Sequence, residues 1–142
     1  MNMAEAEQMT RRESREAIFQ LLYAREFFRD MEFTEFYAYY SENAEKIYNE
    51  FVKSAFLGVC ENMEAIDAEI EASSVKWKIS RMAKVTRNIL RLAVYELTLS
   101  DVPAKAVINE ALELAKKYDD DQSPAFINGI LNKIARDHEL LG

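Results

Sequence analysis

The chain has few of the residues that carry thiol and metal chemistry. Of its 142 residues, one is cysteine, Cys60, and one is histidine, His138. A single cysteine excludes an intramolecular disulfide, and one residue of each type leaves a zinc site without enough nitrogen and sulfur ligands. We therefore expect no metal and no cofactor in this protein.

Glycine and proline are scarce too, with three and two residues. Together with abundant Ala, Glu, Leu, Lys and Met, this scarcity favours a nearly all-helical protein with few tight turns. No apolar run approaches the ~20 residues that span a bilayer, and the opening MNMAEAEQM lacks the basic and apolar blocks of a signal peptide. The sequence therefore predicts a cytoplasmic protein that does not enter a membrane.

Motifs of catalytic sites are missing as well. The sequence contains no glycine-rich phosphate loop, no Cys/His or Ser/His arrangement, and no Glu-x-x-His motif for a carboxylate-bridged metal pair. The acidic run at 119–121 lies between predicted helices, where such runs are usually solvated. We therefore expect a protein that is not an enzyme.

Apolar residues at three- and four-residue spacing predict six or seven helices. The first begins at Thr10, which has the capping-box spacing with Glu13, and continues to about Phe28. A short helix and the start of a long one are expected within 33–51, and the long helix continues to about Ser74. Further helices are predicted over 83–100, 104–118 and 125–140, with Ser123 and Pro124 as the cap and first turn of the last.

The predicted break near Ser74 divides the chain into two roughly equal helical halves. We take residues 1–9 as a flexible N-terminus and 10–142 as one domain, with an N-terminal half over 10–74 and a C-terminal half over 75–142. Because the sequence has neither an internal repeat nor a Gly/Ser linker, we expect the halves to pack on each other as one unit.

Charge is unevenly distributed in this acidic chain, whose formal net charge is −7. Residues 10–29, the first basic island, carry five Lys or Arg against three Asp or Glu. Residues 76–91, the second basic island, carry six against none, whereas residues 30–75 carry two against eleven. Two basic islands in an acidic body indicate a polyanion as partner, and the acidic remainder suppresses indiscriminate binding.

The first basic island continues an apolar helical stripe. At about 100° per residue, Arg11 and Arg15 point within ~40° of each other, on the side that Ile18 and Leu22 occupy further along. Since a bundle does not bury an unpaired charge, this end either overhangs the core or is covered by carboxylates. Two interpretations stay open: surface arginines paired with acidic neighbours, or guanidinium groups that bind nucleic-acid phosphates.

Four strings in the second half stand out by their order and spacing: RLAVYEL at 91–97, INEA at 108–111, ELAKKY at 113–118 and FINGIL at 126–131. With these strings the chain resembles the NusB family of bacterial transcription antitermination factors. The segment RRESREAIFQLLY at 11–23 is similar to the family's opening of clustered arginines and an aliphatic helix that ends in Leu-Tyr. Residues 27–75 match the family in helical pattern only.

The resemblance implies an all-helical fold of two small three-helix bundles packed together. It also implies a factor that binds the single-stranded boxA element in the leaders of ribosomal RNA operons and promotes their transcription. Members of the family act with NusE, the small-subunit ribosomal protein that doubles as a transcription factor, on elongating RNA polymerase with other Nus factors. We expect the same partners here.

The candidate RNA-binding residues are Arg11, Arg12, Arg15, Tyr23, Arg87 and Phe126. The three N-terminal arginines match those that the family is expected to place on phosphates, and Tyr23 matches the aromatic residue that closes that segment. Phe126 is a second aromatic residue for stacking on unpaired bases, and its surroundings fit a core position equally well. Arg87 comes from the second basic island. Gln122 and Ser123 are candidates for contact with NusE.

Three positions depart from the family's usual pattern. Members commonly have an acidic residue where Thr86 and Gln122 stand and a lysine where Ala125 stands. The missing lysine weakens the expected RNA contact near Phe126, and the changed loop at Gln122 alters the expected fit to NusE.

An alternative function is a non-catalytic protein-interaction scaffold, or a homodimer, whose basic islands are buried in an interface. Aromatic residues cluster at 33–40 and are flanked by glutamates, which argues against RNA at that place. Helix packing or a protein interface fits this cluster better. Salt-dependent RNA binding distinguishes the two functions.

Overall fold

The computed structural model describes residues 9–141, and these residues form seven α-helices and one short 3-10 helix. In chain order they are α2 (Arg11–Arg25), α3 (Phe33–Glu42), α4 (Glu50–Glu61), α5 (Met63–Ser73), η1 (Ile79–Arg81), α6 (Lys84–Leu99), α7 (Ala104–Tyr118) and α8 (Ser123–Asp137). No strand occurs within 9–141, which confirms the predicted all-helical class. Over the same range, no helix combines the length and apolar character needed to cross a bilayer. The predicted flexible N-terminus lies outside the described residues, except for Met9.

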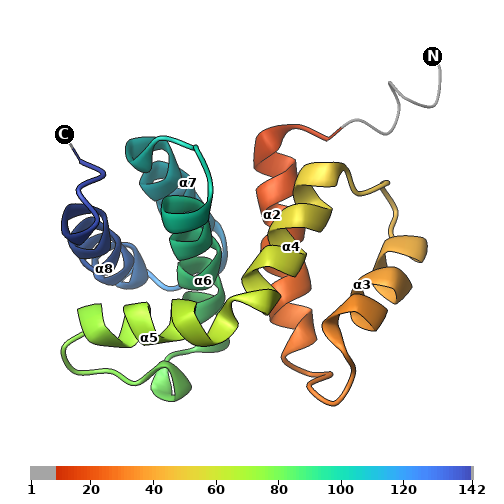
Figure 1. The fold of residues 1–142 in the computed structure, drawn as a ribbon, viewed down its shortest axis with the longest axis horizontal. Helices are drawn as coiled ribbons and strands as arrows, with labels where there is room; N and C mark the ends of the chain where they lie inside the picture. Colours follow the sequence, from red (N-terminus) through yellow and green to blue (C-terminus); the bar gives the residue numbers. More distant parts are fainter. Residues whose placement is uncertain (1–8, 142) are drawn as a thin grey trace. The chain divides into compact units, whose positions relative to one another are not determined.

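The chain divides into two compact units, residues 1–61 and 62–142. The first unit contains α2, α3 and α4, and the second contains α5 to α8 with η1 (Figure 1). The division falls between Glu61 and Asn62, earlier than the predicted break near Ser74. That the two units form one domain remains a prediction.

The predicted long helix is two helices in the structure. α4 ends at Glu61 and α5 begins at Met63, and Asn62 between them has φ −108° and ψ 14°, outside the helical region. Asparagine favours helix ends over helix interiors. The apolar spacing nevertheless continues across it from Val59 to Ile66, so periodicity alone predicts one helix. Because α5 belongs to the second unit, that unit holds four α-helices.

The first unit packs its three helices around an aromatic and aliphatic core. Phe36 of α3 is fully buried, and its ring centroid lies 5.7 Å from that of Phe56 and 4.4 Å from that of Tyr40. Ile18 and Leu22 of α2 are buried as well. Burial of this apolar face fixes the position of α2, the helix that begins with the arginines of the first basic island.

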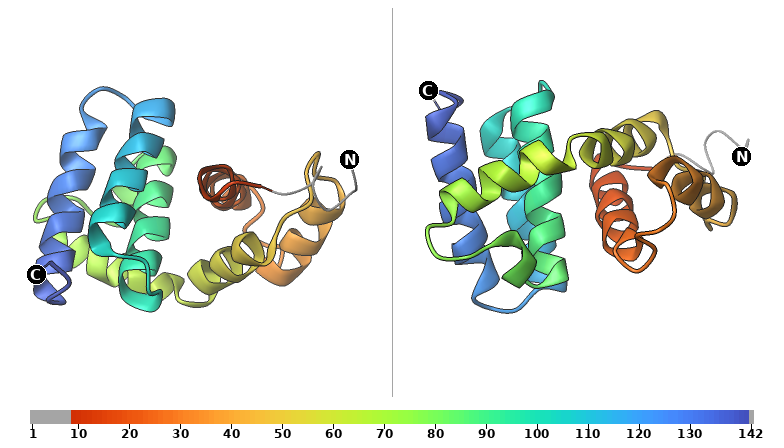
Figure 2. Two further views of the ribbon diagram at one scale, coloured as in Figure 1. Left: turned by 90° about the horizontal axis from the view of Figure 1, so that it is seen from above. Right: turned by 60° about the horizontal axis from the view of Figure 1, so that its bottom comes forward.

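The second unit has α6 as its central helix. α7 and α8 lie beside α6, and α5 packs across α6 and α8 (Figure 2). Ile89, Leu90 and Val94 of α6 are fully buried, because α6 contacts all three other α-helices of the unit. This packing holds the start of α6, the segment before it and the start of α8 in fixed positions.

Candidate nucleic-acid interface

α2 places its three N-terminal arginines in two different environments. Arg11 and Arg12 are exposed, whereas Arg15 is only 7% exposed. The Arg11 guanidinium carbon lies 3.9 Å from the ring centroid of Phe51 on α4, and that of Arg15 lies 5.6 Å from the same centroid. Stacking on a ring orients a guanidinium while its N–H groups, which lie in its plane, stay available for phosphate.

Arginines at the start of a helix face the positive end of its dipole, so the start of α2 needs another source of stability. The Glu13 N–H donates to Thr10 Oγ1 at 3.0 Å, and the Thr10 N–H donates to Glu13 Oε1 at 3.0 Å. This reciprocal pair is the predicted capping box, which the structure confirms. Hydrogen bonds from Lys46 and then from Thr10 hold the pKa of Glu13 down at about 2. The Glu13 carboxylate therefore stabilises the helix start that the arginines oppose.

Tyr23 lies at the other end of α2, about 18 Å from Arg11 along the helix axis. Its half-buried ring has its centroid 5.5 Å from that of Phe27 and 6.4 Å from that of Phe19. Phe27 is 60% exposed. One end of α2 thus offers guanidinium groups for phosphates, and the other offers aromatic faces for bases.

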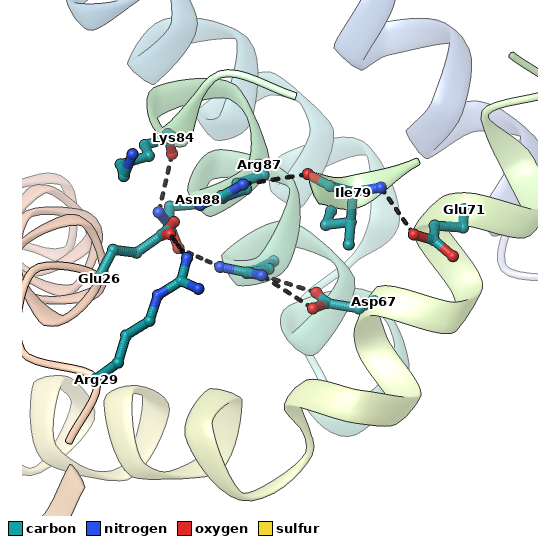
Figure 3. Close-up of polar contacts among 9 residues, drawn as sticks. Glu26, Arg29, Asp67, Glu71, Ile79, Lys84, Arg87 and Asn88 are labelled. Atoms are coloured by element: carbon teal, nitrogen blue, oxygen red, sulfur yellow. Dashed lines mark hydrogen bonds and ion pairs between the residues drawn. The ribbon is translucent and has the colours of Figure 1, made fainter. Parts of the chain in front are cut away.

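The fold uses two arginines of the second basic island for its own stability. Arg91 donates from Nε to Asp67 Oδ1 at 2.8 Å and from Nη2 to Asp67 Oδ2 at 2.9 Å, which joins α6 to α5. Arg87 donates from Nη1 to the Ile79 carbonyl oxygen at 3.3 Å and is 6% exposed (Figure 3). Arg87, one of the candidate RNA-binding residues, is therefore buried and supports the segment before α6.

A cleft of about 370 Å³ lies beside the remaining cations of this island. Its lining comes from the segment before α6, the first turn of α6 and the start of α8. Trp77 and Phe126 are its aromatic residues, and Arg81 and Gln122 are among its polar ones. Phe126 is half-buried and faces this cleft, so it lines a surface site rather than only the core.

Gln122 and Ser123 stand where α8 begins. Asp120 Oδ1 accepts hydrogen bonds from the Ser123 hydroxyl at 2.9 Å and from the N–H groups of Gln122 and Ser123 at 3.0 Å each. These bonds, led by the one from the Ser123 hydroxyl, lower the pKa of Asp120. Because α8 begins at Ser123, the N-cap residue is Gln122 and the prediction of Ser123 as the cap is wrong. The Asp120 carboxylate, two residues before the N-cap, accepts the first N–H of the helix instead. Gln122 is exposed, whereas Ser123 is buried with its hydroxyl engaged.

Thr86 departs from the family pattern in a way that the structure explains. Its hydroxyl donates to Asp119 Oδ2 at 2.6 Å, and the residue is 7% exposed. A carboxylate at this position would face the Asp119 carboxylate instead of donating to it. Ala125 is exposed at the start of α8.

Trp77 and Arg81 are cleft residues that the sequence analysis does not single out. A signal was available, because the only tryptophan of the chain stands within the carboxylate-free run 76–91. In the aromatic cluster at 33–40, Phe36 and Tyr37 are buried and Tyr39 is 60% exposed, so most of it packs helices. Among residues 9–141, no group of three or more His, Cys, Asp or Glu is arranged to hold a metal ion.

Comparison with known proteins extends over most of the chain. The NusB family model matches residues 12–136. The transcription antitermination protein NusB of Lachnoclostridium phytofermentans is 43% identical over 130 residues, which cover 89% of this chain and 98% of that protein. The NusB of Anaeromyxobacter dehalogenans is 58% identical over 78 residues, a match that spans about half, 55%, of each protein.

A solved structure of the antitermination factors NusB and NusE in complex with dsRNA has a similar chain. That chain is 30% identical to this one and superposes with a TM-score of 0.76, covering 89% of this chain and 96% of that chain. Sequence and fold therefore agree over nearly the whole length. This chain belongs to the NusB family of transcription antitermination proteins.

Proposed function

We propose that this chain binds single-stranded, boxA-like leader RNA together with NusE. In this proposal it acts in the cytoplasm on elongating RNA polymerase, with other Nus factors, and promotes transcription of ribosomal RNA. Membership of a family of antitermination factors also confirms the prediction that the chain is not an enzyme.

The exposed guanidinium groups of Arg11 and Arg12 carry the RNA part of the proposal. Both side chains stand at the first turn of α2, and no carboxylate within 9–141 forms an ion pair with Arg11. Guanidinium groups bind phosphate through two parallel N–H donors. Because the chain as a whole carries −7, a polyanion binds only where such groups gather, and these two arginines define that place.

The partner part of the proposal is supported by the similar chain in the complex of NusB, NusE and dsRNA. For this chain, single-stranded RNA fits the surface better than a duplex. Tyr23 and Phe27 offer ring faces that unpaired bases can stack on, whereas the bases of a duplex are already stacked. The deep groove of duplex RNA also hides base edges from side chains.

A titration tests the proposal directly. Fluorescently labelled boxA-like RNA, a scrambled single strand of the same composition and a duplex form are each titrated with the protein, with and without NusE. We expect the boxA-like strand to bind most tightly, and we expect NusE to tighten that binding. Equally weak binding of all three RNAs, unchanged by NusE, would overturn the proposal.

One observation favours the alternative of a protein scaffold or a homodimer. Phe27, Phe28 and Tyr39 of the first unit are 60%, 45% and 60% exposed, more than aromatic residues usually are. Sedimentation of the protein alone and with RNA separates the cases. A dimer that stays intact and does not bind RNA would favour the scaffold. A stable complex with RNA supports the antitermination function.

A further inference from the structure

Trp77 is the most unusual exposed side chain of the second unit. It is the only tryptophan of the chain, it is 49% exposed, and it lines the cleft of about 370 Å³ described above. Tryptophan offers the largest ring face among the side chains, and such a face is normally covered. The family resemblance and the proposed function assign no role to it.

The backbone around Trp77 is fixed rather than loose. The Ser74 hydroxyl accepts from the Trp77 N–H at 2.9 Å and donates to the Trp77 carbonyl oxygen at 2.7 Å. The Ile79 N–H donates to Glu71 Oε1 at 2.8 Å (Figure 3). Val75 is held at φ 56°, a left-handed conformation that β-branched residues rarely adopt. These contacts fix the backbone that carries the indole, and the Trp77 residue stays 49% exposed.

Three cations lie near Trp77 in the sequence, and the cleft lining contains Arg81 and the Asp120 carboxylate, which accepts hydrogen bonds from Gln122 and Ser123. Lys76, Lys78 and Arg81 are exposed, and within 9–141 none of the three forms an ion pair with a carboxylate. Arg81 lines the cleft itself. A flat ligand that carries negative charge fits an aromatic wall beside the Arg81 guanidinium, and a nucleotide of a polyanionic strand is such a ligand.

The remaining lining of the cleft suits a nucleobase in size and polarity. Phe126, which the resemblance places on RNA, lines the same cleft, and the exposed Gln122 amide offers both a donor and an acceptor there. The cleft volume is near the lower end of the range of about 300–1,000 Å³ for small-ligand pockets. An apolar side chain of a protein partner would fit the volume but would leave the exposed Arg81 guanidinium in the lining without a ligand.

We propose that this cleft receives one unpaired base of the bound RNA, with Trp77 as its stacking wall and Arg81 at the adjacent phosphate. The inference rests on the proposed RNA-binding function and adds to it a base-binding subsite that uses Trp77. It makes Trp77 a determinant of affinity for single strands, separate from the arginines of α2.

The fluorescence of the only tryptophan reports on the subsite directly. Titration with boxA-like single-stranded RNA quenches this fluorescence, and the quenching saturates together with the anisotropy of labelled RNA. Trp77→Ala weakens RNA binding about five- to hundredfold, the range for loss of one base stack, and Trp77→Phe restores most of the affinity. Because Trp77 is half exposed, both variants keep the fold, which circular dichroism checks.

RNA with a single abasic nucleotide at successive positions locates the base. We expect that removing the base at one of these positions weakens RNA binding by wild-type protein by the same factor as Trp77→Ala. The same abasic RNA should bind Trp77→Ala no more weakly than intact RNA does. Tyr39→Ala, which removes an aromatic residue of the first unit that is 60% exposed, leaves RNA affinity unchanged.

The outcomes separate this inference from the proposed function. If wild-type protein binds RNA but its tryptophan is not quenched and Trp77→Ala binds equally well, the subsite is refuted and the proposed function stands. If the wild type does not bind RNA at all, both fail. If Trp77→Ala loses NusE but keeps its RNA affinity, the cleft holds a protein side chain and the inference is overturned.

Discussion

Replacing Asp67 with alanine removes the carboxylate that pairs with the Arg91 guanidinium, which is almost buried between α5 and α6. The side chains of Arg91 and Asp67 are 11% and 20% exposed, and two parallel hydrogen bonds of 2.8 and 2.9 Å join them. Breaking a buried pair on one side costs 3–5 kcal/mol as a rule. Because the carboxylate side is partly reached by water, we expect a loss of about 3 kcal/mol in unfolding free energy, or roughly 10 °C in Tm.

Thermal and urea unfolding followed by circular dichroism measure this loss. Glu69→Ala is the matched control, because Glu69 also stands on α5 and pairs with His138, but both side chains are substantially exposed, at 36% and 41%. Such a surface pair contributes about 0–1 kcal/mol. Adding Arg91→Met to Asp67→Ala recovers part of the loss, because the buried charge is then removed together with its carboxylate partner. Equal losses for Asp67→Ala and Glu69→Ala would refute the reasoning.

Two further predictions concern single contacts. Thr86→Val keeps the shape of the side chain but removes the hydroxyl that donates to Asp119, so we expect it to lower the unfolding free energy by about 2 kcal/mol. Thr86→Ser keeps the hydroxyl and should stay near wild type in urea titrations. A loss below about 0.5 kcal/mol for Thr86→Val would show that the hydrogen bond contributes nothing to stability. The pKa of Glu13 is lowered from 4.5 to about 2 by Lys46 and Thr10, so its contribution to stability is fully present above pH 4.5 and is lost as the pH falls from 4.5 to about 2. Glu13→Gln, which keeps the capping hydrogen bond without the charge, flattens stability against pH in that window; an unchanged acid profile of this variant would contradict the pKa assignment.

The sequence correctly predicts the structural features that depend on residues close together in the chain. The capping box of Thr10 and Glu13 spans three residues, and the structure has both of its hydrogen bonds. The helices after residue 83 also follow from local apolar spacing, because α6 and α7 each have one strongly buried face. At Asn62 the same periodicity is misleading, since a helix break need not interrupt the apolar pattern.

Contacts between residues that are distant in the sequence decide which cations remain at the surface. The sequence does not reveal these contacts. The second basic island has no carboxylate of its own, yet Asp67 from α5 neutralises Arg91. Arg15 is buried beside Phe51, which lies on another helix. Counting charges along the chain therefore overstates how many cations are exposed. Of the three arginines at the start of α2, Arg11 and Arg12 are exposed and remain the proposed phosphate ligands.

The salt dependence of RNA affinity tests the role of these two arginines most directly. For single strands, each phosphate contact contributes about −0.7 to the slope of log K against log salt concentration. Arg11→Ala combined with Arg12→Ala should make the slope shallower by about 1.4 and weaken binding in a protein that stays folded. Arg29→Ala, which removes an exposed arginine of the same island that pairs with Glu26 at 2.9 Å, should leave the slope unchanged. A folded double variant with wild-type affinity and wild-type slope would contradict phosphate binding by Arg11 and Arg12.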